Sequence, residues 1–220
     1  MKPAPAILRA WAKATQKCGL PCNLSKPGSA AWARDTIKET AYHESGHVAA
    51  AAFTGCEFSH ITVVSLIPAV GNGKGRVLQQ GTMERHINIY SPRVAFRLGL
   101  RYMLGHLAGR AAEFRICQSL DMDELEEARN EPGNDLFWAD KMANLLARRN
   151  MSANRILKLT YRWTDEMLDL PQVWQAVETL AALLLINGKV KQGPKLQEIF
   201  GPIMDLSMRL PKWRDRLWCC

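Results

Sequence analysis

The stretch His43-Glu44-Ser45-Gly46-His47 decides how the rest of the chain is interpreted. On a helix, residues four apart lie one turn apart on the same face, so His43 and His47 can bind one zinc ion. Glu44 stands between them and can reach a water molecule on that ion. Zinc lowers the pKa of a water it binds, and a neighbouring carboxylate can take the proton and pass it to a leaving amine. The stretch therefore predicts a one-zinc site with two histidine ligands and Glu44 as the general base.

The residues around this stretch favour a helix. Alanine, a strong helix former, fills positions 49–52. Thr36 and Glu39 have the spacing of a capping box, and Gly55 stands where a helix C-terminus is usually closed. The sequence therefore predicts a metal-binding helix over 36–54.

Length and composition indicate one globular domain, or one domain with a small appendage. The chain has 220 residues, of which 47% are hydrophobic and 23% charged. We expect a metallopeptidase domain over 36–210, an N-terminal extension or linker over 1–35 and a C-terminal tail over 211–220. The net charge of +8 is scattered and no recognised nucleic-acid motif accompanies it, so no nucleic-acid partner is expected.

The longest apolar run, Leu180–Ile186, has seven residues, far fewer than the roughly 18 that a membrane span needs. No apolar core follows Lys2 and Arg9, so the N-terminus does not have the pattern of a secretory signal. A cytoplasmic protein without a membrane segment is expected. The six cysteines are then predicted to be reduced thiols.

Hydrophobic periodicity predicts a mainly α fold, a helical bundle with a small β-sheet. A two- or three-stranded sheet is expected beside the metal-binding helix, with strands over 61–66 and 76–83. The remaining helices are expected over 92–117, from about 131 to 149, and over 152–168, 171–187 and 194–210. The β-branched run in the first strand could pair with an extended peptide by edge addition, which makes Val63, Val64 and Ser65 candidate substrate-binding residues. The alternative is that the run is simply a strand in the core of the sheet.

A catalytic zinc takes a third protein ligand, and the residue pattern alone leaves five candidates. These are the carboxylates of Glu113, Asp121, Asp123, Asp135 and Asp140. His106 is interpreted as a core or partly exposed histidine rather than as a ligand.

Three blocks of the sequence resemble the peptidase domain of the FtsH family of ATP-dependent zinc metalloproteases. Ala41–His47 looks like its metal-binding helix, Leu107–Glu113 is similar to its Gly-Gly-Arg-x-Ala-Glu helix, and Gly133–Leu136 resembles its Ser-Asn-Asp-Leu turn. The likeness extends over about residues 36–205. It implies that Asp135 is the third zinc ligand and that Glu113 supports the site or packs its helix.

The resemblance implies a zinc-dependent endopeptidase that acts on unfolded or flexible protein substrates. The family carries an ATPase module ahead of this domain, and no P-loop is present here, so the chain is expected to be ATP-independent by itself. A homo-oligomer or a separate ATPase is a predicted partner. The approach to Asp135, Arg129–Gly133, departs from the family pattern, and the alternative is a catalytically silent zinc-binding module that acts with a partner protein.

Overall fold

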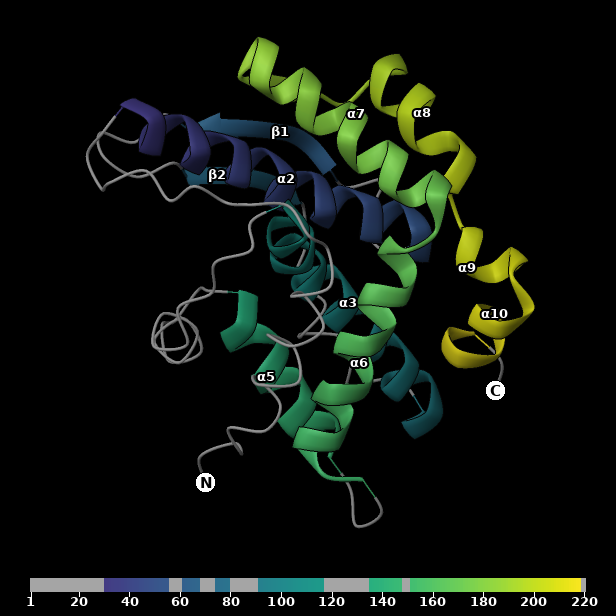
Figure 1. Cartoon of the computed structure of the whole chain (residues 1–220). Coiled ribbons are helices and arrows are strands. Elements are labelled where there is room, and N and C mark those ends of the chain that lie inside the picture. Colours follow the sequence, from purple (N-terminus) through teal and green to yellow (C-terminus); the bar gives the residue numbers. More distant parts are fainter. Residues whose placement is uncertain are drawn as a thin grey trace.

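The structure, a computed structural model, describes residues 30–55, 61–67, 74–79, 91–116, 135–147 and 151–218. The described part is mainly helical, as predicted, and Figure 1 shows its helices crossing one another beside a small sheet. The longer helices are α2 (Ala30–Thr54), α3 (Pro92–Ile116), α5 (Asp135–Leu146), α6 (Ala153–Leu168) and α7 (Pro171–Asn187). The shorter ones are α8 (Pro194–Phe200), the 3₁₀ helix η5 (Gly201–Ile203), α9 (Leu206–Arg209) and α10 (Pro211–Leu217).

Most of the predicted helix ends are found where their capping residues stand. Ser152 caps α6, since its hydroxyl accepts a hydrogen bond from the backbone N–H of Arg155 at 3.3 Å. Pro171 begins α7, and the fixed φ of proline suits the first turn of a helix. Gly55 and Gly188 follow α2 and α7 with φ of 64° and 67°, the left-handed conformation that glycine adopts without strain.

The start of the metal-binding helix was predicted wrongly. α2 begins at Ala30, so Thr36 lies inside the helix and is not its N-cap. The reason is that the residues before Thr36 include three alanines, at 30, 31 and 33, and an arginine, which all favour helix. A capping box marks a helix start only where the residues before it do not themselves favour a helix.

Helices α2 and α3 form the centre of the core and approach each other closely. Val48 and Ala52 of α2 and Leu104 and Ala108 of α3 have no exposed surface. Gly46 makes the approach possible, because a Cβ atom there would lie 2.3 Å from the carbonyl oxygen of Ala108. The two helices can therefore bring side chains on their facing surfaces into direct contact.

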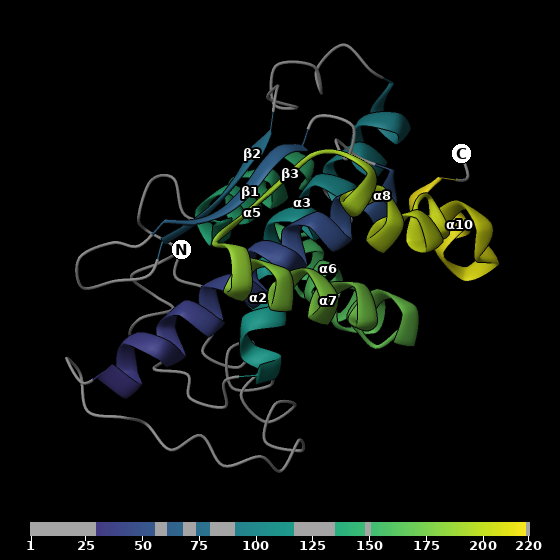
Figure 2. The same ribbon diagram turned by 90° about the horizontal axis from the view of Figure 1, so that it is seen from above.

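The predicted sheet is present and has a third strand. β1 (Ile61–Ile67) lies between β2 (Lys74–Gln79) and β3 (Lys189–Lys191), and both pairings are antiparallel. Figure 2 shows the three strands side by side along α2. The sequence allowed for a third strand but did not locate β3, because three residues are too few to show an alternating pattern.

The C-terminal region differs from the prediction of one helix over 194–210 and a tail from 211. It forms α8, η5, α9 and α10, because Pro202 and Pro211 interrupt a continuous helix and Asp205 has a φ of 54°. Trp213 and Leu217 of α10 are 3% and 0% exposed, so one side of this helix packs against the core. Figure 1 shows α9 and α10 packed together near the C-terminus.

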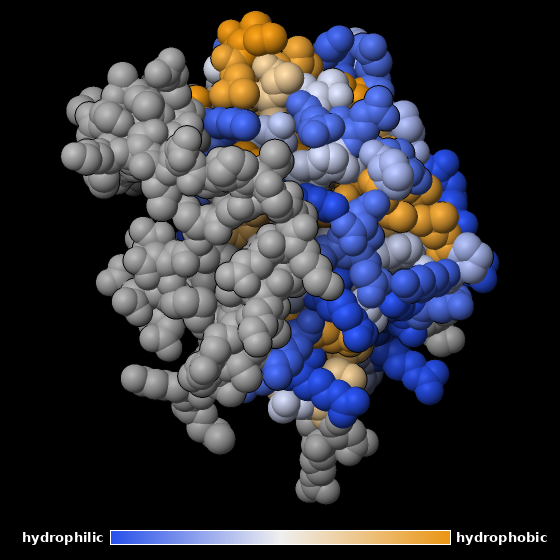
Figure 3. Space-filling view, viewed as in Figure 1, coloured by the Kyte–Doolittle hydropathy of each residue, from blue (hydrophilic) through white to orange (hydrophobic). Residues whose placement is uncertain are grey.

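The surface carries few exposed hydrophobic side chains over the described residues. Figure 3 shows a hydrophobic area over the upper end of α7, where Leu185 and Ile186 are exposed. None of the described helices is both long and apolar enough to cross a bilayer. Outside the described residues lie 1–29, the six cysteines, and the ligand candidates Asp121 and Asp123.

Candidate metal centre

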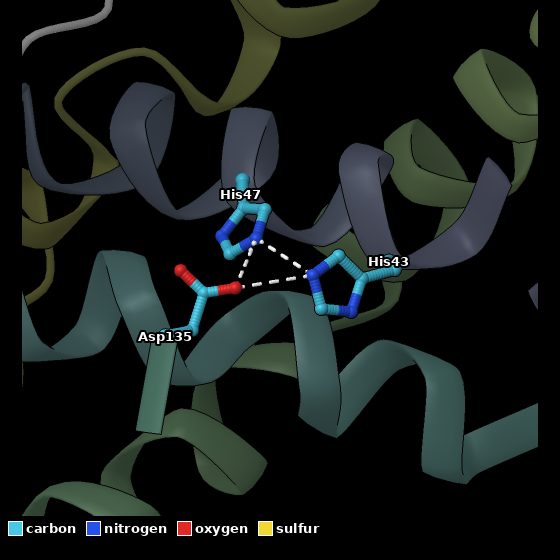
Figure 4. A group of neighbouring side chains, drawn as sticks. All are labelled: His43, His47 and Asp135. Atoms are coloured by element: carbon cyan, nitrogen blue, oxygen red, sulfur yellow. Dashed lines mark hydrogen bonds and ion pairs between the residues drawn. The ribbon is translucent and has the colours of Figure 1, made fainter. Parts of the chain in front are cut away.

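Three ligand-type side chains converge between α2 and the first residue of α5. The Nε2 atoms of His43 and His47 lie 3.0 Å apart, and each lies 3.1 Å from Oδ2 of Asp135. Figure 4 shows the two rings and the carboxylate pointing toward one another. Within the part of the chain that the structure describes, this is the one group of three histidine, cysteine or acidic side chains that could hold a metal ion.

Both histidines have their second ring nitrogen held by α3. Nδ1 of His47 donates to the backbone carbonyl of Gly105 at 2.7 Å, and Nδ1 of His43 donates to Oε2 of Glu113 at 3.0 Å. A carbonyl and a carboxylate only accept hydrogen bonds, so each Nδ1 carries a proton. Each Nε2, the atom that faces Asp135, is then the nitrogen available to a metal.

Glu113 has the supporting place that the resemblance implies. Arg110, one turn earlier on α3, donates to both of its carboxylate oxygens at 3.0 and 3.1 Å. Glu113 is thereby fixed on the side of His43 that faces away from Asp135. The contact of Glu113 with Nδ1 orients the imidazole of His43. Glu113 itself lies outside the converging group.

Asp135 is held by a third histidine. Nδ1 of His106 donates to Oδ1 of Asp135 at 2.8 Å, while Oδ2 faces His43 and His47. The two oxygens of one carboxylate thus have different partners. Asp140, another of the ligand candidates, lies one turn further along α5 and accepts from its neighbour Asn144, so it is not part of the group.

Gly109 provides the space in which the two imidazoles lie. A Cβ atom on this residue would be 2.5 Å from Nε2 of His47 and 3.0 Å from Cδ2 of His43. Only hydrogen fits at that position of α3. Gly109 belongs to the block Leu107–Glu113, and the structure gives a steric reason for glycine at this position.

Glu44 lies close to the histidines and is 5% exposed. Its negative charge contributes to raising the pKa of His47, so the carboxylate is near that ring. It is not one of the three converging groups. Glu44 therefore lies near His47 without belonging to the ligand set, and its role as a general base stays a prediction from the sequence.

The buried carboxylates give the site a preference for positive charge. Burial alone would lower the pKa of His43, but hydrogen bonds to Asp135 and Glu113 outweigh it and raise the pKa to about 10. Burial would likewise raise the pKa of Asp135, yet the charge of His47 and the hydrogen bonds from His106 and His43 hold it well below its usual range. In the absence of a metal the site keeps a proton among these groups, a charge that a cation can replace.

The spacing of the three atoms fits a small metal ion. A tetrahedral ion with bonds of about 2.0–2.1 Å holds its ligand atoms about 3.3 Å apart. The observed separations of 3.0 to 3.1 Å are only slightly shorter. Two imidazole nitrogens and one carboxylate oxygen suit zinc and other first-row divalent metals, so the described side chains could hold such an ion.

The predicted substrate-binding strand is not available for edge addition. Val63, Val64 and Ser65 are paired with β2 on one side and with β3 on the other. Because β1 is the central strand, its backbone hydrogen-bonding groups already have partners at these residues. The prediction that they receive an extended peptide is therefore wrong.

His106 and Arg110 are the site residues that the sequence interpretation missed. They stand seven and three residues before Glu113 on α3, which places all three on one face of the helix. This spacing was visible in the sequence. A lone histidine is more often a core residue, however, and the partner of His106 lies 29 positions away.

A scan against models of known protein families and a search among curated proteins both returned no match to this chain. The likeness to the FtsH peptidase domain therefore rests on the three sequence blocks alone.

Proposed function

We propose that this chain is a zinc-dependent endopeptidase that hydrolyses peptide bonds in unfolded or flexible protein segments. The observation that supports it most is the convergence of His43 Nε2, His47 Nε2 and Asp135 Oδ2 beside a buried glutamate. This is the donor set of a catalytic zinc, with three protein ligands. A cytoplasmic location remains a prediction from the sequence.

Zinc, when bound, supplies a Lewis acid that acidifies water and polarises a carbonyl group. The side chains of the protein bind the ion and transfer the proton. His43, His47 and Asp135 would hold the ion. Glu44 accepts the proton of the attacking water on its carboxylate and delivers it to the nitrogen of the leaving amine. Burial of Glu44 keeps the carboxylate from being fully solvated, which favours proton transfer.

The second candidate is a zinc-binding module without peptidase activity that acts with a partner protein. The pairing of β1 on both sides favours it, because the strand expected to receive a substrate is internal to the sheet. The ligand set is common to both candidates. Only Glu44 distinguishes them, since a silent module does not use a general base.

The two candidates are separated by activity and zinc content measured together. We expect the purified chain, loaded with one zinc ion, to cleave an unfolded casein-type substrate. Glu44→Gln should lower the rate by at least about a hundredfold, the usual contribution of a general base, while the zinc content stays at one. Absence of cleavage in the zinc-loaded wild type, or an unchanged rate in the glutamine variant, would contradict the peptidase.

The third ligand has a matched control on its own helix. Asp135→Asn removes the anionic oxygen that faces both histidines, so it should lower zinc affinity and activity together. Asp140→Asn makes the same chemical change one turn further along α5, where the carboxylate contacts Asn144. The control variant should keep both properties.

A further inference from the structure

One helix contacts the far side of every candidate ligand. On α3, the Gly105 carbonyl accepts from His47, Glu113 accepts from His43, and His106 donates to Asp135. The first two contacts orient histidines that α2 already places one turn apart. The third acts on a ligand from another part of the chain, at the first residue of α5.

We infer that His106 is a positioning residue for the metal site: it engages Oδ1 of Asp135 so that Oδ2 alone faces the ion. This inference rests on the zinc site of the proposed function. The distances support it, because Oδ1 lies 2.8 Å from Nδ1 of His106 while Oδ2 lies 3.1 Å from each ligand nitrogen. Because each carboxylate oxygen of Asp135 has its own partners, the carboxylate cannot rotate freely about its Cβ–Cγ bond.

The ring of His106 is itself held in place. Tyr102, one turn earlier on α3, packs edge-on against it with 4.4 Å between the ring centroids. The imidazole is partly buried, with 21% of its side chain exposed. A partly buried donor on a rigid helix loses little conformational freedom when it binds the carboxylate. The ring of His106 is therefore oriented to donate to Asp135 in the metal-free protein.

His106 does not have the geometry of a fourth ligand. Its Nδ1 contacts the oxygen of Asp135 that is turned away from His43 and His47. It also does not belong to the group whose ligand atoms all lie within 4.8 Å of one another. Its contribution to the metal therefore goes through Asp135.

The test compares three substitutions that place a hydrogen-bond donor differently. Asn at 106 presents an amide N–H near the position of histidine Nδ1, Gln presents it near Nε2, and Leu presents none. Zinc affinity is measured by competition with a chromophoric chelator, and the cobalt-substituted proteins are examined by visible absorption. The thermal unfolding midpoint of each metal-free variant reports the integrity of the fold.

We expect His106→Leu to weaken zinc binding by about 10- to 100-fold, the usual effect of losing a contact behind a ligand. His106→Asn should recover most of that loss and His106→Gln little of it. The cobalt spectrum should keep the form of the wild type in the variants that bind. If His106→Leu fails to fold, the difference in zinc affinity between His106→Asn and His106→Gln tests the inference by itself.

Three results would overturn the inference. Equal zinc affinity in Asn and Gln variants would show that the donor position is irrelevant. A cobalt spectrum with altered coordination would make His106 a ligand. A wild-type chain that binds no zinc would remove the ligand that His106 is inferred to direct. A chain that binds zinc with the expected order of affinities but cleaves nothing would contradict only the peptidase proposal.

Discussion

The α-hydrogen of Gly109 lets α3 lie close to α2 and leaves room for the imidazoles of the candidate metal site. Its α-hydrogen occupies the place where a Cβ would lie 2.5 Å from Nε2 of His47, the atom that faces Asp135. A methyl group there cannot be accommodated by a small rotation of the ring, because Nδ1 of His47 is tied to the carbonyl of Gly105. The residue therefore limits the site sterically without contributing a functional group.

Substitution of Gly109 by alanine should weaken zinc binding by at least about tenfold, since the ring of a ligand must move. Gly105→Ala is the matched control, because its Cβ meets no atom of the described residues within 4 Å. That control should bind zinc as the wild type does and gain about 0.5–1 kcal/mol of stability from better helix propensity. Affinities by chelator competition and urea unfolding of the metal-free proteins check both. Equal zinc affinity in the two variants would mean that Gly109 has no steric role.

The raised pKa of His43 predicts that zinc binding at the proposed site depends on pH. Below the ordinary value of 6.5 its protonated form stabilises the metal-free fold fully, and this contribution is lost as the pH rises through about 10. Zinc needs the neutral imidazole, so binding near pH 8 should release at least one proton. Affinity should rise about tenfold for each pH unit from 7 to 9. Calorimetry in two buffers with different ionisation enthalpies measures the release, and a pH-independent affinity would contradict the expectation.

At the scale of single elements, the sequence predicted those parts of the fold that are encoded by neighbouring residues. Ser152, Pro171 and Gly188 end or begin their helices as expected, because capping is a local interaction. Thr36 shows the limit of the same rule, since a capping pattern inside a longer helix-forming segment does not start a helix. The likeness of Gly133–Leu136 to a family motif led to Asp135, which the residue pattern alone left among five carboxylates.

The position of β1 within its sheet could not be predicted in the same way. Its partner β3 follows α7, more than 120 residues later, and has only three residues. Strand order is decided by this distant pairing, which leaves no local pattern. Among the described strands, any peptide that extends the sheet has to add to the outer side of β2 or β3. Experiments on substrate binding are therefore better directed at those two strands.

At the scale of the whole molecule, the C-terminal residues complete the core. Trp213 of α10 packs edge-on against Phe53 of α2, with 5.1 Å between ring centroids, and lies 6.4 Å from the ring of Trp163. Arg216 donates to Glu166 of α6 at 2.6 Å. The last described helix thus connects α2 to the helical bundle.

Replacement of Trp213 by alanine should lower the free energy of unfolding by about 3–5 kcal/mol, as for other buried tryptophans. Met208→Ala in α9 is the control, since that side chain is 45% exposed and its loss should change stability by no more than about 0.5 kcal/mol. Urea unfolding followed by circular dichroism measures both. A loss for Trp213→Ala as small as that of the control would instead favour the prediction of a C-terminal tail over 211–220.

The dependence of each ligand on α3 has a consequence for protein engineering. Grafting the five residues His43–His47 onto an unrelated helix would transfer two imidazoles but not the carbonyl of Gly105 or the carboxylate of Glu113 that orient them. Such a graft would have to recruit a second helix, glycine included, to reproduce the site. The smallest transplantable unit is thus a pair of crossed helices together with the aspartate that meets them.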